Sequence, residues 1–306
     1  MGAQLREARR RIKSVQSTKK ITRAMELIAA SRIVKAQQRI AASRPYAEAI
    51  TEVVRSVTAP GVVSEDHPLT TPRESVGAAA LLLITSDRGL AGGYSANILR
   101  AGEQTTAKLR EQGISTVPYL VGRKAIGYYR FRGRDTSHAW SGFSEQPSYD
   151  DAKAVAEDLL EHFVKGSSDG GVDEIHLVFT HFESMATQRV SIVRLLPLDP
   201  AELPQGDETE PAAVTGLMEF EPEGAGVLDA LLPRYLTARI FTAMLEAAAS
   251  EQAARRRAMK SATDNADELI KKLTRDANAA RQAEITQEIM EIVGGAEALA
   301  GAGRDQ

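Results

Sequence analysis

The chain has 306 residues, of which 43% are hydrophobic, and a formal net charge of −3. It contains no cysteine, which excludes disulfides, thiol nucleophiles and thiolate metal sites. The charge is unevenly distributed, because residues 1–59 carry 13 basic and 4 acidic side chains, whereas residues 60–226 carry 14 and 25. The longest apolar run, residues 78–84, is far shorter than the about 20 residues of a membrane helix, so we expect no insertion into lipid.

The first segment, residues 1–59, has the pattern of one long helix. Residues 2–58 contain no glycine after Gly2 and a single proline, Pro45, where the helix could kink or end its first part. Apolar or small residues recur in steps of three and four or their sum, which predicts a coiled-coil seam of Ile12, Val15, Thr22, Met25, Ala29, Ala36 and Ile40. Other apolar residues fall outside this seam and indicate that something beyond one partner helix surrounds it: Ile21, Leu27, Ile28 and Val34.

The middle segment, residues 76–200, alternates strands with helices. Strands are predicted over 76–86, 115–122, 173–182 and 187–198, the last at an edge, and helices over 95–113 and 150–166. This alternation predicts an α/β fold with a doubly wound, Rossmann-like sheet. Residues 201–226 are acidic and rich in proline and glycine, which is typical of a loop.

The last segment, residues 227–300, mirrors the first. It has no proline after Pro233 and no glycine between Gly226 and Gly294, so a helix is expected over 234–293. Its predicted seam comprises Met259, Ala262, Ala266, Leu269, Leu273, Ala277 and Ala280. Two such long helices at opposite ends of one chain can bury their apolar seams against each other by forming an antiparallel coiled coil.

Motifs that carry chemistry are weak in this sequence. Residues 86–94, SDRGLAGGY, follow the first strand, but they lack the spacing of a dinucleotide-binding loop and are not a Walker A loop, so a tight turn is favoured over an anion site. The five histidines show no metal-ligand spacing, and no catalytic set is recognisable. The arginine runs at 9–11 and 255–257 lack neighbouring aromatic residues for base stacking. We therefore expect no catalytic residue, no cofactor, no metal and no nucleic acid.

Four segments, in order along the chain, carry a resemblance to a known family: 16–37, 86–98, 250–273 and 280–299. With these segments the chain resembles the gamma subunit of F-type ATP synthase. The resemblance implies a non-catalytic central rotor shaft, one copy per complex, that couples proton-driven rotation of the c-ring to conformational cycling of the catalytic beta subunits. The implied partners are the alpha, beta and epsilon subunits and the c-ring. The implied location is the cytoplasmic face of the cell membrane, as a peripheral protein.

The resemblance also assigns roles to particular residues. It implies beta-subunit contacts at Lys19, Lys20, Arg23, Met25, Arg281 and Gln282. It implies an apolar bearing of Ile285, Ile289, Ile292 and Val293. It implies a foot against the c-ring and the epsilon subunit that includes Glu219, Glu221 and Tyr235.

One loop departs from most of the family and resembles actinobacterial members, which carry an extra loop there. It comprises Gly166, Ser167, Ser168, Asp169, Gly170 and Gly171, and its composition predicts an exposed, flexible segment. As a hypothesis, this loop touches a neighbouring subunit and restrains rotation in one direction.

Two other classes of function stay open from the sequence. A coiled-coil adaptor with an α/β head would form a stable homodimer in isolation. A nucleotide-dependent enzyme using residues 86–94 would bind a nucleotide saturably.

Overall fold

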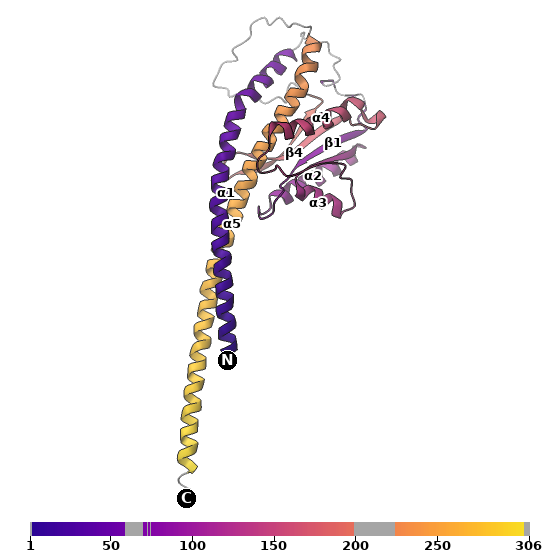
Figure 1. Ribbon diagram of the computed structural model, residues 1–306. Helices are drawn as coiled ribbons and strands as arrows, with labels where there is room; N and C mark the ends of the chain where they lie inside the picture. Colours follow the sequence, from indigo (N-terminus) through magenta and orange to yellow (C-terminus); the bar gives the residue numbers. More distant parts are fainter. Residues whose placement is uncertain (1, 59–69, 72, 74, 199–223, 303–306) are drawn as a thin grey trace. The chain divides into compact units, whose positions relative to one another are not determined.

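The computed structural model describes residues 2–58, 70–71, 73, 75–198 and 224–302. The chain divides into two compact units, one of residues 1–28 with 256–306 and the other of residues 29–255. Two long helices, α1 (Gly2–Val57) and α5 (Gly224–Ala302), contribute to both units (Figure 1). Among the described residues, none of the helices combines the length and hydropathy that crossing a membrane requires.

Both long helices continue through residues that usually end helices. Helix α1 passes through Pro45, and α5 passes through Pro233 and Gly294, so the C-terminal helix is longer than the predicted 234–293. A proline inside a helix costs about 3 kcal/mol. At Pro233, the neighbouring Leu232 and Leu236 are both buried, and their burial offsets that cost.

The residues between the long helices form a five-stranded sheet of order β3-β2-β1-β4-β5. The strands are β1 (Ala78–Ile84), β2 (Ser115–Val121), β3 (His138–Trp140), β4 (Glu174–Phe182) and β5 (Gln188–Leu196). The first four are mutually parallel, and β5 pairs with β4 in the antiparallel sense, which confirms its predicted edge position. The connecting helices are α2 (Tyr94–Glu111), α3 (Arg123–Phe131) and α4 (Tyr149–Lys165), followed by the short 3-10 helix η1 (Ser167–Asp169).

Both faces of the sheet are covered, as the continuous apolar run of β1 predicts. Leu82 and Ile84 of β1 share a core with α4, whereas Leu81 and Leu83 share a core with α2 and α3. Figure 1 shows α4 on one side of the sheet and α2 and α3 on the other. The doubly wound α/β fold is confirmed. Strand β3 and helix α3 were not predicted, because three and nine residues are too few for a clear periodic pattern.

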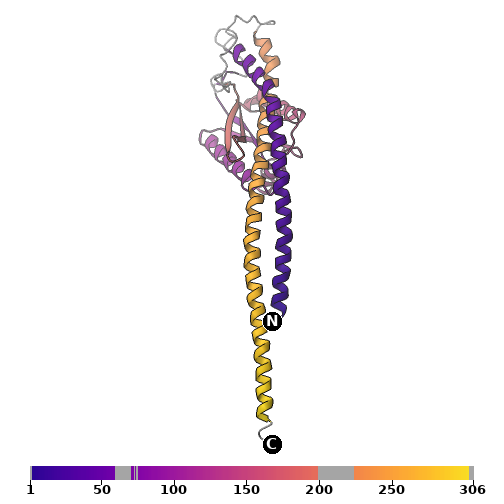
Figure 2. The same cartoon turned by 90° about the vertical axis from the view of Figure 1, so that its left-hand side faces the viewer.

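The core on the α4 side extends to the long helices. Val54 of α1 and Ile240 of α5 are fully buried in the same cluster as Leu159 of α4 and Leu82 of β1. Figure 2 shows the upper parts of α1 and α5 running side by side in front of the sheet. In this unit the α/β domain is therefore attached to both long helices through one continuous apolar core.

Candidate functional site

The unit of residues 1–28 and 256–306 contains an antiparallel coiled coil of α1 and α5. The hydroxyl oxygens of Thr22 and Thr263 lie 2.7 Å apart, and Lys19 Nζ lies 2.5 Å from Asp267 Oδ1. Moving three residues back along α1 thus moves four residues forward along α5. This register confirms the predicted antiparallel pairing.

The predicted seam is largely correct, with one error on α5. Thr22, Met259, Ala266 and Ala277 are buried, as expected. Leu269, however, is 44% exposed, so its assignment to the seam is wrong. The buried and half-buried residues of α5 follow steps of four and three through Met259, Thr263, Ala266, Ile270, Leu273 and Ala277. Leu269 precedes Ile270 by one residue, which places it about 100° around the helix from the seam.

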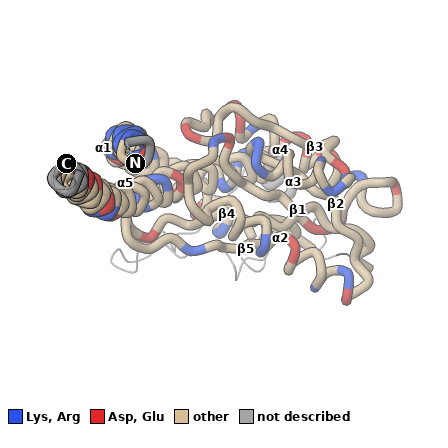
Figure 3. The backbone as a smooth tube through the Cα atoms, turned by 90° about the horizontal axis from the view of Figure 1, so that it is seen from below, with Lys and Arg blue, Asp and Glu red and all other residues tan. Residues whose placement is uncertain are grey.

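The residues of α1 that are predicted to contact the beta subunits differ in their exposure and in their ion pairs within the chain. Lys20 is exposed, whereas Lys19 is paired with Asp267. Arg23 NH1 lies 2.8 Å from Glu26 Oε2, and Met25, a residue of the predicted seam, is half-buried. Figure 3 shows Lys and Arg residues along α1 near its N-terminus. Part of this positive charge is thus balanced within the chain.

Large apolar side chains outside the seam of α1 are exposed, as predicted. The exposed fractions are 58% for Ile21, 58% for Leu27, 52% for Ile28 and 52% for Val34. Single exposed apolar residues are ordinary on protein surfaces, but four within 14 residues of one helix indicate a surface that a partner covers.

The end of α5 carries a second exposed apolar group. The register that joins Thr22 to Thr263 places Gly2 opposite about residue 283, so the following part of α5 has no α1 residue beside it. Ile285, Ile289, Ile292 and Val293 are 46%, 55%, 72% and 51% exposed. Arg281 and Gln282, just before them, are also exposed.

The predicted foot is only partly described. Glu219 and Glu221 lie outside the described residues. Tyr235 is only 4% exposed and belongs to the core between the long helices and the sheet, where burial raises its pKa. The expectation that Tyr235 presents a contact surface is therefore wrong, because its side chain is buried against other residues of the chain.

The loop of residues 166–171 is exposed at its tip and closed at its base. Ser168, Asp169 and Gly170 are exposed, and Ser167–Asp169 form η1. At the base, Gly171 N donates to Gly166 O at 2.7 Å, and Ser167 N donates to Asp173 Oδ1 at 3.0 Å. These bonds define a compact turn at the base of the loop, and the exposure of its tip is as expected.

Asp173 organises the base of this turn. Its carboxylate pairs with Arg73 at 2.8 Å and accepts the backbone N–H of Gly77 at 2.7 Å in addition to that of Ser167. Burial acts to raise the pKa of Asp173, but the hydrogen bonds from Ser167, Gly77 and Ala78 outweigh it and lower the pKa to about 2.

Asp173→Asn should lower the free energy of unfolding by about 2 kcal/mol at pH 7. The pKa of the Asp173 carboxyl is lower in the folded chain than in the unfolded chain. The stabilisation is therefore complete above the pKa that this carboxyl has in the unfolded chain, and it is lost as the pH falls toward 2. Urea unfolding between pH 7 and pH 3 measures both effects. The exposed Asp169→Asn is the control and should change stability by less than about 0.5 kcal/mol. Equal losses in the two variants, or a difference independent of pH, would contradict this assignment.

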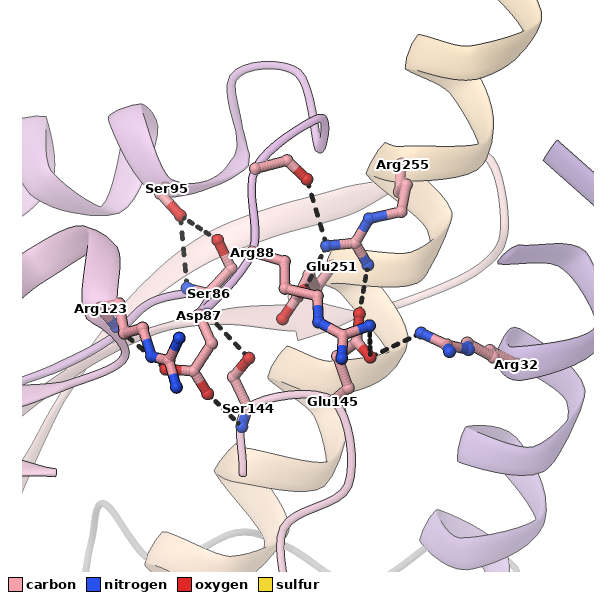
Figure 4. A network of polar contacts seen from close by, with 11 residues as sticks. Arg32, Ser86, Asp87, Arg88, Ser95, Arg123, Ser144, Glu145, Glu251 and Arg255 are labelled. Carbon is pink, nitrogen blue, oxygen red and sulfur yellow. Dashed lines mark hydrogen bonds and ion pairs between the residues drawn. The ribbon is translucent and has the colours of Figure 1, made fainter. Parts of the chain in front are cut away.

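An ionic junction that is buried only in its inner half joins the α/β domain to both long helices (Figure 4). Glu145, in the loop between β3 and α4, lies 2.5 Å from Arg32 NH1, 3.3 Å from Arg88 NH1 and 3.1 Å from Arg255 NH1. These arginines come from α1, from the turn after β1 and from α5, so one carboxylate connects three parts of the unit. We name this set, together with Glu251, the Glu145 junction.

The inner half of the junction is shielded from water. Arg255 is 5% exposed and Glu251 is 1% exposed, and Arg255 NH2 lies 2.6 Å from Glu251 Oε1. Burial raises the pKa of Glu251, while the charge of Arg255 acts to lower it. The sequence alone does not predict this junction, because Arg32 and Glu145 are 113 residues apart and no local pattern relates them.

The turn of residues 86–94 is held by the chain itself. Ser86 Oγ and Ser95 Oγ lie 2.7 Å apart, and the Asp87 carboxylate accepts the backbone N–H groups of Arg123 at 3.0 Å and Ser144 at 3.0 Å (Figure 4). It also accepts the backbone N–H of Gly142 at 2.8 Å. In doubly wound sheets, ligands bind at the carboxyl ends of the strands. Here the Asp87 carboxylate accepts backbone N–H groups at the carboxyl ends of the strands, where a bound anion would otherwise accept them. This supports the tight turn rather than an anion site.

Comparisons with known proteins identify the family. A family model described as ATP synthase matches residues 4–299. The ATP synthase gamma chain of Acidothermus cellulolyticus is 61% identical over 308 residues and covers 100% of both chains. That of Kineococcus radiotolerans is 58% identical over 306 residues and covers 99% of each. The chain belongs to the ATP synthase gamma chain family.

Solved structures share the fold of this gamma-family chain. The rotor of the Euglena gracilis mitochondrial ATP synthase matches with a TM-score of 0.60 and 16% identity, covering 93% of this chain and 100% of that one. The central stalk and c-ring structure of the Tetrahymena thermophila enzyme matches with a TM-score of 0.56 and 23% identity, covering 79% and 99%. Membership makes this chain a component of an enzyme complex, and it confirms the resemblance that its four segments carried.

Proposed function

We propose that this gamma-family chain is the central rotor shaft of F-type ATP synthase, coupling proton-driven rotation of the c-ring to the conformational cycle of the catalytic beta subunits. The observation that carries the proposal is a two-helix coiled coil with exposed apolar side chains outside its seam. Ile21, Leu27 and Ile28 on α1 and Ile289 and Ile292 on α5 are exposed, and the described residues of their unit do not cover them. A surrounding ring of subunits would cover them.

Torque requires a stiff link between the domain that receives it and the helices that deliver it. The α/β domain is attached to α1 and α5 by a continuous apolar core and by the Glu145 junction. Both helices then continue without a break into the coiled-coil unit. A rotation imposed on the α/β domain would therefore be carried by two hydrogen-bonded helices rather than by a flexible linker.

The contacts with neighbouring subunits are assigned by surface chemistry. Lys20 and Arg23 would meet acidic side chains of the beta subunits through charge attraction, which tolerates a changing angle better than directional hydrogen bonds do. Met25, Arg281 and Gln282 would lie in the same contact region. The apolar end of α5 would turn inside an apolar bearing.

The remaining assignments concern the foot, the chemistry and the location. The foot against the epsilon subunit and the c-ring would include Glu219 and Glu221. The chain would do no bond chemistry itself, would be present in one copy per complex, and would act at the cytoplasmic face of the cell membrane as a peripheral subunit. The tip at residues 168–170 would touch a neighbouring subunit and restrain rotation in one direction.

The test is native mass spectrometry of the chain co-expressed with its alpha, beta and epsilon subunits, with ATPase activity measured on the same sample. One copy bound to three alpha and three beta subunits is the expected result. Ile289→Asp should leave the stability of the isolated chain within about 0.5 kcal/mol, because this residue is exposed, but should lower the ATPase activity of the assembled complex.

Glu288→Gln, which changes the neighbouring exposed residue, is the matched control and should leave assembly and activity unchanged. A stable homodimer that does not enter the ring would overturn the rotor proposal and favour a coiled-coil adaptor. Equal activity in the Ile289→Asp and parent complexes would overturn the bearing.

A further inference from the structure

Two histidines and an aspartate meet at one edge of the α/β domain. His138 is the first residue of β3, and Asp158 and His162 lie one turn apart on α4. Each offers one potential metal-ligand atom, and these three atoms lie within 4.8 Å of one another. The sequence alone shows no metal-ligand spacing here, because His138 lies 20 residues before Asp158 and only the packing of β3 beside α4 brings them together.

Hydrogen bonds define which ring nitrogen of each histidine carries a proton. His162 Nδ1 lies 2.9 Å from the backbone oxygen of Asp158, which only accepts, so Nδ1 donates and Nε2 keeps a lone pair when the ring is neutral. His138 Nδ1 lies 2.7 Å from Asp158 Oδ2, so these two atoms already face each other, and an ion between them would take the place of the proton that they share. On His162, donation from one ring nitrogen to a carbonyl is the arrangement that orients a metal-binding histidine.

A buried hydroxyl beside the cluster provides a second, independent observation. The Tyr119 ring is fully buried and stacks on the His138 ring, with centroids 4.3 Å apart and planes inclined by 13°. It also meets the His162 ring edge-on at 6.1 Å. Among the described residues, the Tyr119 hydroxyl oxygen has no hydrogen-bond partner. A buried phenol without a partner is uncommon, and a bound water molecule is one group that would satisfy it.

We propose that His138, Asp158 and His162 bind one Zn²⁺ ion or a divalent ion of similar chemistry, with a water molecule that accepts from the Tyr119 hydroxyl. Two imidazole nitrogens and one carboxylate oxygen are a usual donor set for zinc with an open fourth position. Bonds of about 2.0–2.2 Å in a tetrahedron place ligand atoms about 3.4 Å apart, so a small side-chain adjustment closes the site. The side chains are 19%, 28% and 22% exposed, which leaves an ion access from solvent.

A bound ion would connect β3 to α4. Strand β3 has only three residues and pairs with β2 alone, so it is held by few backbone bonds. A metal ion that binds the folded chain but not the unfolded chain would raise the midpoint of thermal unfolding. This inference is independent of the rotor proposal, because it concerns the isolated chain.

The full chain, freed of metal with EDTA and then dialysed, is titrated with ZnCl₂ by calorimetry, and Co²⁺ binding is followed by its visible absorption. One ion per chain, tetrahedral Co²⁺ absorption and a higher thermal midpoint are expected. His162→Gln should weaken zinc binding at least about tenfold and abolish the thermal shift. His181→Gln, in an exposed histidine paired with Glu246, is the matched control and should bind like the parent.

Circular dichroism establishes that each variant is folded, and His138→Gln serves as the second variant should His162→Gln unfold. No zinc uptake by the parent chain would overturn the proposal. Equal zinc binding by the parent, His162→Gln and His138→Gln chains would overturn it as well.

Discussion

Arg255→Met should destabilise the chain by about 3–5 kcal/mol, because removing one partner of a buried ion pair leaves an uncompensated charge. Glu251, 1% exposed, would lose the guanidinium that lies 2.6 Å away. Its pKa, already raised by burial, would rise further, so it would take up a proton on folding. Glu145 would lose its buried partner at the same time.

Urea unfolding of the parent chain, both single variants and the double variant gives the coupling between these residues. Arg255→Met with Glu251→Leu should recover most of the loss, because a buried ion pair replaced by apolar residues is often neutral in stability. Arg88→Met is the matched control, since Arg88 approaches the same Glu145 carboxylate but is 69% exposed. It should cost less than about 1 kcal/mol. An equal loss in the Arg88 and Arg255 variants would contradict the role given to burial.

Gly122→Ala should be comparably severe, with an expected loss of about 2–5 kcal/mol from backbone strain and overpacking together. Gly122 follows β2 with a φ of 96°, and a Cβ there would lie 2.3 Å from the backbone oxygen of Thr85. That oxygen belongs to a residue that β1 and β2 hold in place, since Thr85 N donates to Val121 O at 2.8 Å. The clash is therefore with rigid backbone rather than with a movable side chain.

Gly113→Ala separates the two causes. Gly113 has a similar φ of 82°, but nothing lies within 4 Å of its added Cβ. It should cost only about 1 kcal/mol, the penalty of a positive φ. Thermal and urea unfolding of both variants measure the difference. Similar losses at the two positions would mean that conformation, and not the close approach to Thr85, requires the glycine at 122.

The sequence alone determined those features that depend on the periodic pattern of a single helix or strand. The three-and-four spacing of Thr22, Met25 and Ala29 was sufficient to predict a seam, because side-chain direction repeats with the helix itself. The continuous apolar run of β1 was sufficient to predict a sheet covered on both faces. The apolar residues outside the seam, such as Leu27, were predicted to be exposed on the same grounds. These inferences need only the geometry of one element.

Packing between distant segments decided the rest. Leu269 is apolar and lies one residue from the seam, and only the partner helix selects Ile270 in its place. Tyr235 carries an apolar ring and a polar hydroxyl, and the sheet core, not its own helix, decides that it is buried. Glu145 meets Arg32 and Arg255, and His138 meets His162, across separations that no local pattern relates. A charge or an imidazole acquires its role from its neighbours, and those neighbours are chosen by tertiary packing.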